Sequence, residues 1–152
     1  MRKLFVSLAL LVAVGFSSAQ GVTVWTHFGD TDLEWLQSEA ASFEAAFGVP
    51  VTITKIELGE LKQKMLLSAP QGEAADLITT LPHDQIAELA AGGVLADMSQ
   101  FATEDYLSDL NEQARLAFTF NGRLFGLPMY VEGPALIVNT DLVPEGEVPA
   151  TY

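Results

Sequence analysis

Segments typical of strands alternate with segments typical of helices along the first half of the chain. The expected strands, rich in Val, Ile and Thr, are 21–26, 49–56 and 75–80, and the expected helices lie within 29–48, 59–69 and 85–91. In such a chain each helix is a crossover that returns the chain to the same end of the sheet, so the strands run parallel. The alternation therefore predicts an α/β fold with a mixed, mostly parallel sheet flanked by helices.

Polar side chains follow two of the expected strands at the point where each strand ends. Asp30 comes after the first strand, and His83 and Asp84 come after the third, where Pro82 stiffens the loop. The carboxyl ends of parallel strands share one edge of the sheet, and ligands bind in the crevice beyond that edge. We therefore expect both carboxylates to face a ligand, with His83 holding Asp84 by a hydrogen bond. The alternative for each aspartate is an N-cap of the helix that follows.

The expected core comes from the apolar stripe of the first helix. Its members at helical spacing are Leu33, Leu36, Ala40, Phe43 and Phe47, and Gly48 is expected to end the helix. Trp25 ends an apolar strand and is expected to be buried, whereas Trp35 lies off the stripe and is expected to be exposed or to contact another element.

The second half of the chain predicts other elements. Residues 103–118 have the pattern of one amphipathic helix with Thr103 as its cap, and Asn121-Gly122 between apolar runs predicts a hairpin. Glu132 then interrupts two apolar runs, the second of which, 135–138, predicts a strand. A carboxylate inside an apolar β-run is costly unless it is satisfied. Glu132 is therefore a candidate for ligand binding, and its alternative is a residue bonded to backbone amides.

The first residues have the pattern of a secretory signal peptide. Arg2 and Lys3 precede an apolar run over 4–16, and small residues follow up to Ala19, where we expect cleavage. The run is too short to span a bilayer. Removal of residues 1–19 would change the net charge from −13 to −15. Such an acidic chain is not expected to bind nucleic acid or anionic lipid, because it repels phosphates.

The sequence offers little support for a metal site, a cofactor site or a catalytic site. His27 and His83 lack the spacing of a metal site, and no P-loop, Ser nucleophile elbow or dinucleotide fingerprint occurs. We therefore expect no metal, no cofactor and no catalytic residue. A glycosidase that uses two carboxylates remains the least favoured alternative.

Several motifs together resemble the amino-terminal part of the maltose/maltodextrin-type solute-binding proteins of ABC sugar importers. They are "VTVWTHFGD", "FEAAFGVPVTI", "KQKMLLSAPQGEAADLI", "PHDQIAELAAGGVLAD", "FTFNGRLFGLPMYVE" and "ALIVNTDLV". Their order and spacing agree with those of the family over nearly all of the chain after residue 19. The stretch "FNGRLFGLPMYVE" followed by "NTDLV" is specific for the sugar-binding branch of the solute-binding proteins.

The resemblance implies a periplasmic-binding-protein-like fold of two lobes that close on a sugar, and a membrane permease as partner. It implies a signal peptide at 1–19, a partial first lobe at 20–129, a hinge crossover at 130–134 and the truncated start of a second lobe at 135–152. Asp30, Asp84 and Glu132 match acids that bind sugar hydroxyls in the family, with His83 and Gln85 beside Asp84. Gln85 stands where the family often has a basic residue, and Thr31 stands where some members have Lys. The resemblance therefore implies that the ligand is a sugar, but it does not identify which sugar.

The function expected on this basis is binding of maltose, trehalose or an oligosaccharide outside the cytoplasm, in the periplasm or the extracellular space. The alternatives are a fragment that cannot bind without the missing lobe and a solute-binding protein for a ligand other than sugar. Half a cleft leaves one face of the ligand in water, which weakens each hydrogen bond to it. We also expect 135–152 to form a mobile tail or a swapped dimer, because its partner strands are missing.

Overall fold

The computed structural model describes residues 21–133 and 135–148. It contains two compact units, Met1–Gln85 and Ile86–Tyr152. The predicted signal peptide lies outside the described residues. Among the helices that the structure describes, none is both long and apolar enough to cross a membrane.

The first unit is built on a parallel sheet of three strands, as the alternation of the sequence predicts. The strands are β1 (Val22–Thr26), β2 (Val51–Lys55) and β3 (Leu77–Ile78), in the order β2-β1-β3. Val24 of β1 pairs with Ile53 on one side and with Leu77 on the other. The central strand is the most buried, and Thr26 at its carboxyl end is completely inaccessible to solvent.

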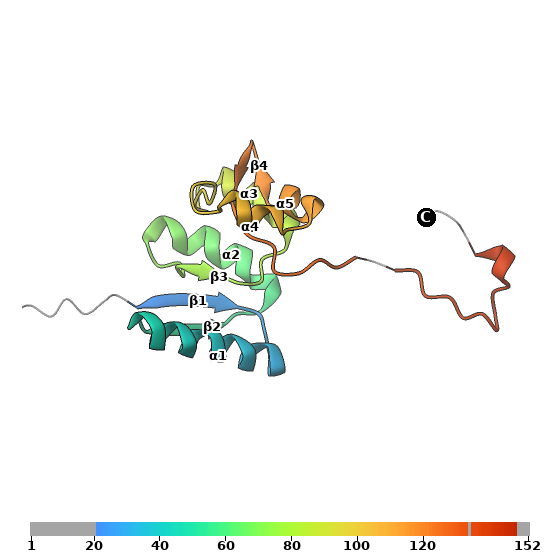
Figure 1. Ribbon diagram of the computed structural model, residues 1–152, viewed down its shortest axis with the longest axis horizontal. Coiled ribbons are helices and arrows are strands. Elements are labelled where there is room, and N and C mark those ends of the chain that lie inside the picture. The colour runs from blue at the N-terminus through green and yellow to red at the C-terminus, as the bar shows by residue number, and fades with distance from the viewer. Residues whose placement is uncertain (1–20, 134, 149–152) are drawn as a thin grey trace, which may run out of the picture. The chain divides into compact units, whose positions relative to one another are not determined.

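Two helices lie on opposite faces of this sheet (Figure 1). Helix α1 (Asp30–Phe47) ends at Gly48, whose φ of 67° is the left-handed conformation that glycine adopts without strain. Helix α2 (Leu58–Ser68) buries Leu61 and Met65 and is followed by the short 3-10 helix η1 (Ala69–Gln71). On the α2 side, Lys64 Nζ lies 4.9 Å from the centre of the buried Trp25 ring. Trp35 is exposed as predicted, and its ring meets that of Phe28 edge-on.

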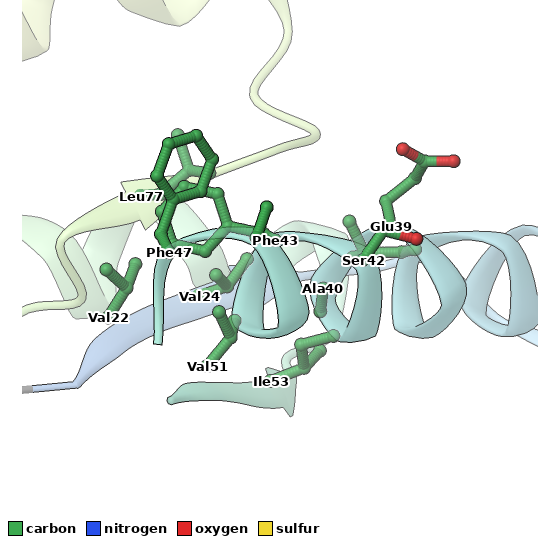
Figure 2. A pocket seen from close by; sticks show the side chains of 12 residues that line it. Val22, Val24, Glu39, Ala40, Ser42, Phe43, Phe47, Val51, Ile53 and Leu77 are labelled. Atoms are coloured by element: carbon green, nitrogen blue, oxygen red, sulfur yellow. The ribbon is translucent and has the colours of Figure 1, made fainter. Parts of the chain in front are cut away.

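The apolar stripe of α1 is only partly core, which corrects the prediction. Leu36 is buried and packs in a cluster with Val24 and Phe28. Phe43 and Phe47 are 40% and 69% exposed. They flank an open groove of about 490 Å³ between the carboxyl-terminal half of α1 and the sheet, where Leu77 of β3 is also exposed (Figure 2). The spacing of the stripe correctly gives the side of the helix that faces the sheet, but nothing among the described residues covers its far end.

The second unit begins with α3 (Ile86–Ala91), which directly follows the 3-10 helix η2 (His83–Gln85) of the first unit. The single helix predicted over 103–118 is wrong, because the structure has two short helices there, α4 (Glu104–Ser108) and α5 (Glu112–Ala117). Thr103 caps α4 as predicted, by accepting a hydrogen bond from the Tyr106 amide. Asn111 caps α5 by accepting one from the Ala114 amide, and such a cap starts a new helix.

The predicted hairpin at Asn121-Gly122 is confirmed. Strands β4 (Thr119–Phe120) and β5 (Arg123–Leu124) pair antiparallel, and both turn residues have positive φ, 49° and 75°. Helix α3 contacts β4.

The strand predicted over 135–138 is absent, because this segment pairs with no strand among the described residues. Leu136 and Ile137 are largely exposed. The last described element is the 3-10 helix η3 (Glu145–Glu147). Whether this part of the chain is mobile or exchanged between two copies stays a prediction.

Candidate ligand-binding site

The segments that follow β1 and β3 are tied together at the carboxyl edge of the sheet. The Thr79 amide donates a hydrogen bond to the Trp25 carbonyl at 3.2 Å, and the His27 amide donates one to Thr80 Oγ1 at 3.0 Å. Thr80 is buried and His27 is half-buried, so this cross-link is partly shielded from water. The edge therefore holds the residues after the two strands side by side, which is what the parallel topology predicts.

Asp30 is the first residue of α1, and its backbone is strained. Its φ of 47° lies in the left-handed region, where residues other than glycine are uncommon and often functional. The N-cap of α1 is Gly29, which has no side chain to cap with, so the N-cap alternative for Asp30 is wrong. The Asp30 side chain is exposed and makes no hydrogen bond or ion pair with the described residues. A carboxylate in this state is available to accept hydrogen bonds from a ligand.

A second carboxylate follows β3. Asp84 lies in η2, exposed, and within the described part of the chain no backbone amide donates to its side chain, which argues against the cap alternative. His83 is also exposed. The hydrogen bond expected between His83 and Asp84 is absent from the described contacts, so that detail of the prediction is wrong.

Three buried polar atoms lie on the segments after β1 and β3 and have no hydrogen-bond partner among the described residues. They are His27 Nδ1, Thr79 Oγ1 and Gln85 Oε1. The sequence predicts Gln85 as a ligand-binding residue, whereas it suggests His27 only as a possible metal ligand and does not single out Thr79. For His27 and Thr79 the available signal was position alone, because each directly follows a strand at the edge that holds Asp30 and Asp84.

A cation also lies at this edge. Lys55 ends β2, and its Nζ lies so close to Gly29 that a Cβ added to the glycine would be 3.1 Å from it. Any larger residue at position 29 would therefore push the lysine away. Lys55 is exposed, and its ammonium can donate to an acceptor on a ligand.

Glu132 belongs to the second unit and is described there alone. It lies in a segment without regular secondary structure, and its side chain is exposed. The expected cost of burying this carboxylate in a β-run therefore does not arise, and the case for Glu132 rests on the sequence motif.

The described residues contain no group of three or more His, Cys, Asp or Glu side chains that could hold a metal ion. What the carboxyl edge offers is a set of hydrogen-bonding groups: two free carboxylates, three unpartnered buried atoms and one ammonium. Such a set can bind and orient a polar ligand.

Comparison with known proteins gives a consistent result. Residues 39–152 match the model of a family described as bacterial extracellular solute-binding protein. A maltotriose-binding protein of Pyrococcus abyssi is 28% identical over 131 residues, which are 86% of this chain and 28% of that protein. A galactooligosaccharide-binding protein of Bacillus subtilis is 26% identical over 117 residues, which are 76% of this chain and 27% of that protein.

Solved structures agree with the fold. The Thermus thermophilus maltotriose binding protein bound with maltotriose is 50% identical, with a TM-score of 0.69 over 70% of this chain and 28% of that chain. A cyclo/maltodextrin-binding protein complexed with maltotetraose is 27% identical, with a TM-score of 0.63 over 71% of this chain and 28% of that one. This chain thus spans little more than a quarter of the length of the relatives it matches.

Proposed function

The chain belongs to the bacterial extracellular solute-binding proteins, and on this premise we propose that it is a sugar-binding component of an ABC importer. The proposed ligand is a malto-oligosaccharide such as maltotriose, bound without chemistry at the carboxyl edge of the β2-β1-β3 sheet. The chain would act outside the cytoplasm after cleavage at Ala19 and would deliver the sugar to a membrane permease.

The observation that carries the proposal is the pair of free carboxylates after adjacent parallel strands. Asp30 and Asp84 are both exposed and unpaired among the described residues, and their strands, β1 and β3, are hydrogen-bonded neighbours. An ionised carboxylate only accepts hydrogen bonds, and neighbouring sugar hydroxyls can donate to both of its oxygens. The maltotriose complex at 50% identity supports the same class of ligand.

The proposed mechanism is closure of two lobes on the sugar. In this proposal residues 20–129 form most of the first lobe, 130–134 the hinge crossover and 135–152 the start of the second lobe. Asp30, His83, Asp84 and Gln85 would bind the sugar from the first lobe, and Glu132 would bind it from the hinge. Exclusion of water on closure strengthens each hydrogen bond, which orients the sugar without cleaving it.

The proposal is tested by isothermal titration of the chain without residues 1–19. The ligands are maltotriose, maltose, trehalose and glucose, and the variants are Asp84→Asn and Asp30→Asn. We expect saturable heat with at least one sugar, and a loss of about 10-fold or more in affinity for each variant, because a charge-assisted hydrogen bond contributes roughly 1.5–3 kcal/mol.

Glu73→Gln is the matched control. Glu73 is exposed like the two aspartates, but it precedes β3 and so lies toward the amino edge of the sheet. Its removal should leave the affinity unchanged. If a chain that is folded by circular dichroism gives no heat with any of the sugars, sugar binding by this chain alone is wrong. Release of free glucose from maltotriose would support the glycosidase alternative.

A further inference from the structure

We infer that Asn121 is a site of spontaneous deamidation and that the β4–β5 hairpin determines how fast it reacts. Deamidation of an asparagine is a reaction between its side chain and the backbone nitrogen of the next residue, and the other reactant is water. Asn121 and Gly122 both belong to the second unit, and their chemistry is independent of the proposed function.

The residue after Asn121 favours the reaction. Among the asparagines of the sequence, Asn111 precedes a glutamate and Asn139 precedes a threonine, whereas Asn121 precedes Gly122. A side chain on the following residue hinders the approach of its nitrogen to the asparagine, and a β-branched side chain such as that of threonine is the stiffest hindrance. Glycine has no side chain, so Asn121 has the least hindered neighbour.

The Asn121 carboxamide is also the least restrained of the three. Asn111 Oδ1 accepts a hydrogen bond from the Ala114 amide at 3.1 Å, and Asn139 Oδ1 accepts one from the Asp141 amide at 3.0 Å. Asn121 is exposed, and its side chain makes no hydrogen bond with the described residues. Its carboxamide can therefore rotate without first breaking a bond to the backbone.

The reaction is a ring closure followed by hydrolysis. The Gly122 nitrogen bonds to Asn121 Cγ and loses its proton, while the bond from Cγ to the side-chain nitrogen breaks and ammonia leaves. Water then opens the resulting succinimide at one of its two carbonyl carbons. Opening at Cγ leaves aspartate, whereas opening at the backbone carbonyl leaves isoaspartate, whose backbone runs through the side chain and is longer by one atom. Both products carry an additional negative charge.

The folded turn opposes the ring closure. Asn121 has φ of 49°, which lies in the left-handed region, where ψ is about +47°. At that ψ the next backbone nitrogen lies nearly opposite Cβ across the Cα–C bond, and Cγ cannot reach it. Phe120 and Arg123 pair directly on either side of the turn and hold it in this conformation. The hairpin must therefore open before Asn121 reacts.

Isoaspartate is expected to disrupt the hairpin, because one additional backbone atom does not fit a loop of two residues whose strands are in fixed register. Leu124 of β5 is buried, its amide donates to Ser99 Oγ at 3.1 Å, and its carbonyl accepts from the Met98 amide at 2.7 Å. A shift of β5 would disturb these bonds. Aspartate at position 121 should be tolerated, since Asp-Gly suits the same turn as Asn-Gly.

The rate of deamidation in three samples tests the site and its control by the hairpin. The samples are the folded chain, the chain unfolded in guanidinium chloride, and the variant Leu124→Ala without denaturant, all kept at pH 8. Peptide mapping by mass spectrometry gives the rate at each asparagine, and an isoaspartate assay identifies the product. Asn111 and Asn139 are internal controls in every sample.

We expect Asn121 to react several-fold faster than the other two asparagines in the unfolded chain. In the folded chain it should react at least about 10-fold more slowly than in the unfolded one, because an equilibrium that favours the closed hairpin by that factor slows the reaction equally. Leu124→Ala removes a buried side chain from β5 and should speed the reaction several-fold relative to the folded wild type.

The stability of the product tests the effect on the hairpin. The isoaspartate form, separated by ion exchange, should unfold at a lower temperature than the unmodified chain, and Asn121→Asp should unfold close to the unmodified chain. Equal midpoints for the isoaspartate form and the unmodified chain would overturn this effect.

Two results would overturn the inference itself. If Asn121 reacts no faster than Asn111 and Asn139 in the unfolded chain, it is not a deamidation site. If the folded chain reacts as fast as the unfolded one, or if Leu124→Ala leaves the rate of the folded chain unchanged, the hairpin does not control the reaction.

Discussion

At the scale of single residues, Asp76 shows how one side chain connects two strands. Its Oδ2 accepts hydrogen bonds from the Thr23 amide at 2.8 Å and from the Thr23 hydroxyl at 2.7 Å, and the Asp76 amide donates to that hydroxyl at 3.1 Å. Thr23 lies in β1, and Asp76 immediately precedes β3. The Thr23 amide, and then its hydroxyl, hold the pKa of the Asp76 carboxyl below its usual value, because both bonds favour the ionised form.

This clamp makes a prediction about pH. A carboxyl whose pKa is lower in the folded state stabilises the fold above its unfolded pKa, near 3.9, and that stabilisation is lost as the pH falls through the folded pKa. We expect Asp76→Asn to lower the free energy of unfolding by about 1 kcal/mol at pH 7, a value reduced for solvent exposure. The difference from the wild-type chain should shrink below about pH 4. Urea unfolding at several pH values measures this, and a difference that stays constant down to pH 2 would contradict it.

Individual residues also mark how far the sequence could predict the site. The positions of Asp30 and Asp84 were predictable, because strand ends follow from local patterns and parallel topology puts those ends at one edge. The free ring nitrogen of His27 was not predictable, since it depends on which groups the folded chain brings near. The exposure of Glu132 was missed for a related reason: the strand expected after it needs partners that the local pattern does not supply.

At the scale of elements, the β4–β5 hairpin depends on the backbone of its turn. Gly122 has φ of 75°, and a Cβ added there would meet no atom within 4 Å. Gly122→Ala should therefore destabilise the protein by about 1 kcal/mol through backbone strain alone. Gly59→Ala in α2 is the matched control, because its Cβ would also lie in open space but its φ is not positive. The control should be neutral or slightly stabilising, and equal losses for the two variants in thermal unfolding would contradict the explanation.

The elements that the sequence predicted correctly are those that local chemistry determines. The Asn121-Gly122 turn and the Thr103 cap depend only on residues next to them in the sequence: both turn residues adopt positive φ, and the Thr103 side chain accepts a hydrogen bond from the Tyr106 amide. The alternation of strands and helices determines the parallel sheet. The helix predicted over 103–118 failed because Asn111 satisfies the amide of Ala114 and starts a new helix inside an unbroken apolar pattern. Hydrophobic spacing alone does not detect such a break.

At the scale of the whole molecule, the groove beside α1 leaves part of the apolar face between this helix and the sheet open. Its wall is almost entirely apolar and includes Val22, Val24, Phe43, Phe47 and Leu77 (Figure 2). The periodicity of α1 gives the residues that share a face, but whether that face is covered depends on parts of a protein far away in sequence. The described residues leave this apolar surface open, and an exposed apolar surface of this kind is available for contact with other groups.

The groove should therefore behave as an accessible apolar surface in solution. We expect the chain to enhance the fluorescence of anilinonaphthalene sulfonate while it is fully folded, and Phe43→Ser with Phe47→Ser to remove most of that enhancement. The double change should lower the free energy of unfolding by no more than about 1 kcal/mol, because both side chains are substantially exposed already. Leu61→Ala, at a side chain with no exposure, is the contrasting variant and should cost about 2–5 kcal/mol. Dye fluorescence that persists in the double variant, or a loss of stability close to that of Leu61→Ala, would mean that the two phenylalanines are buried in solution and that the groove is closed.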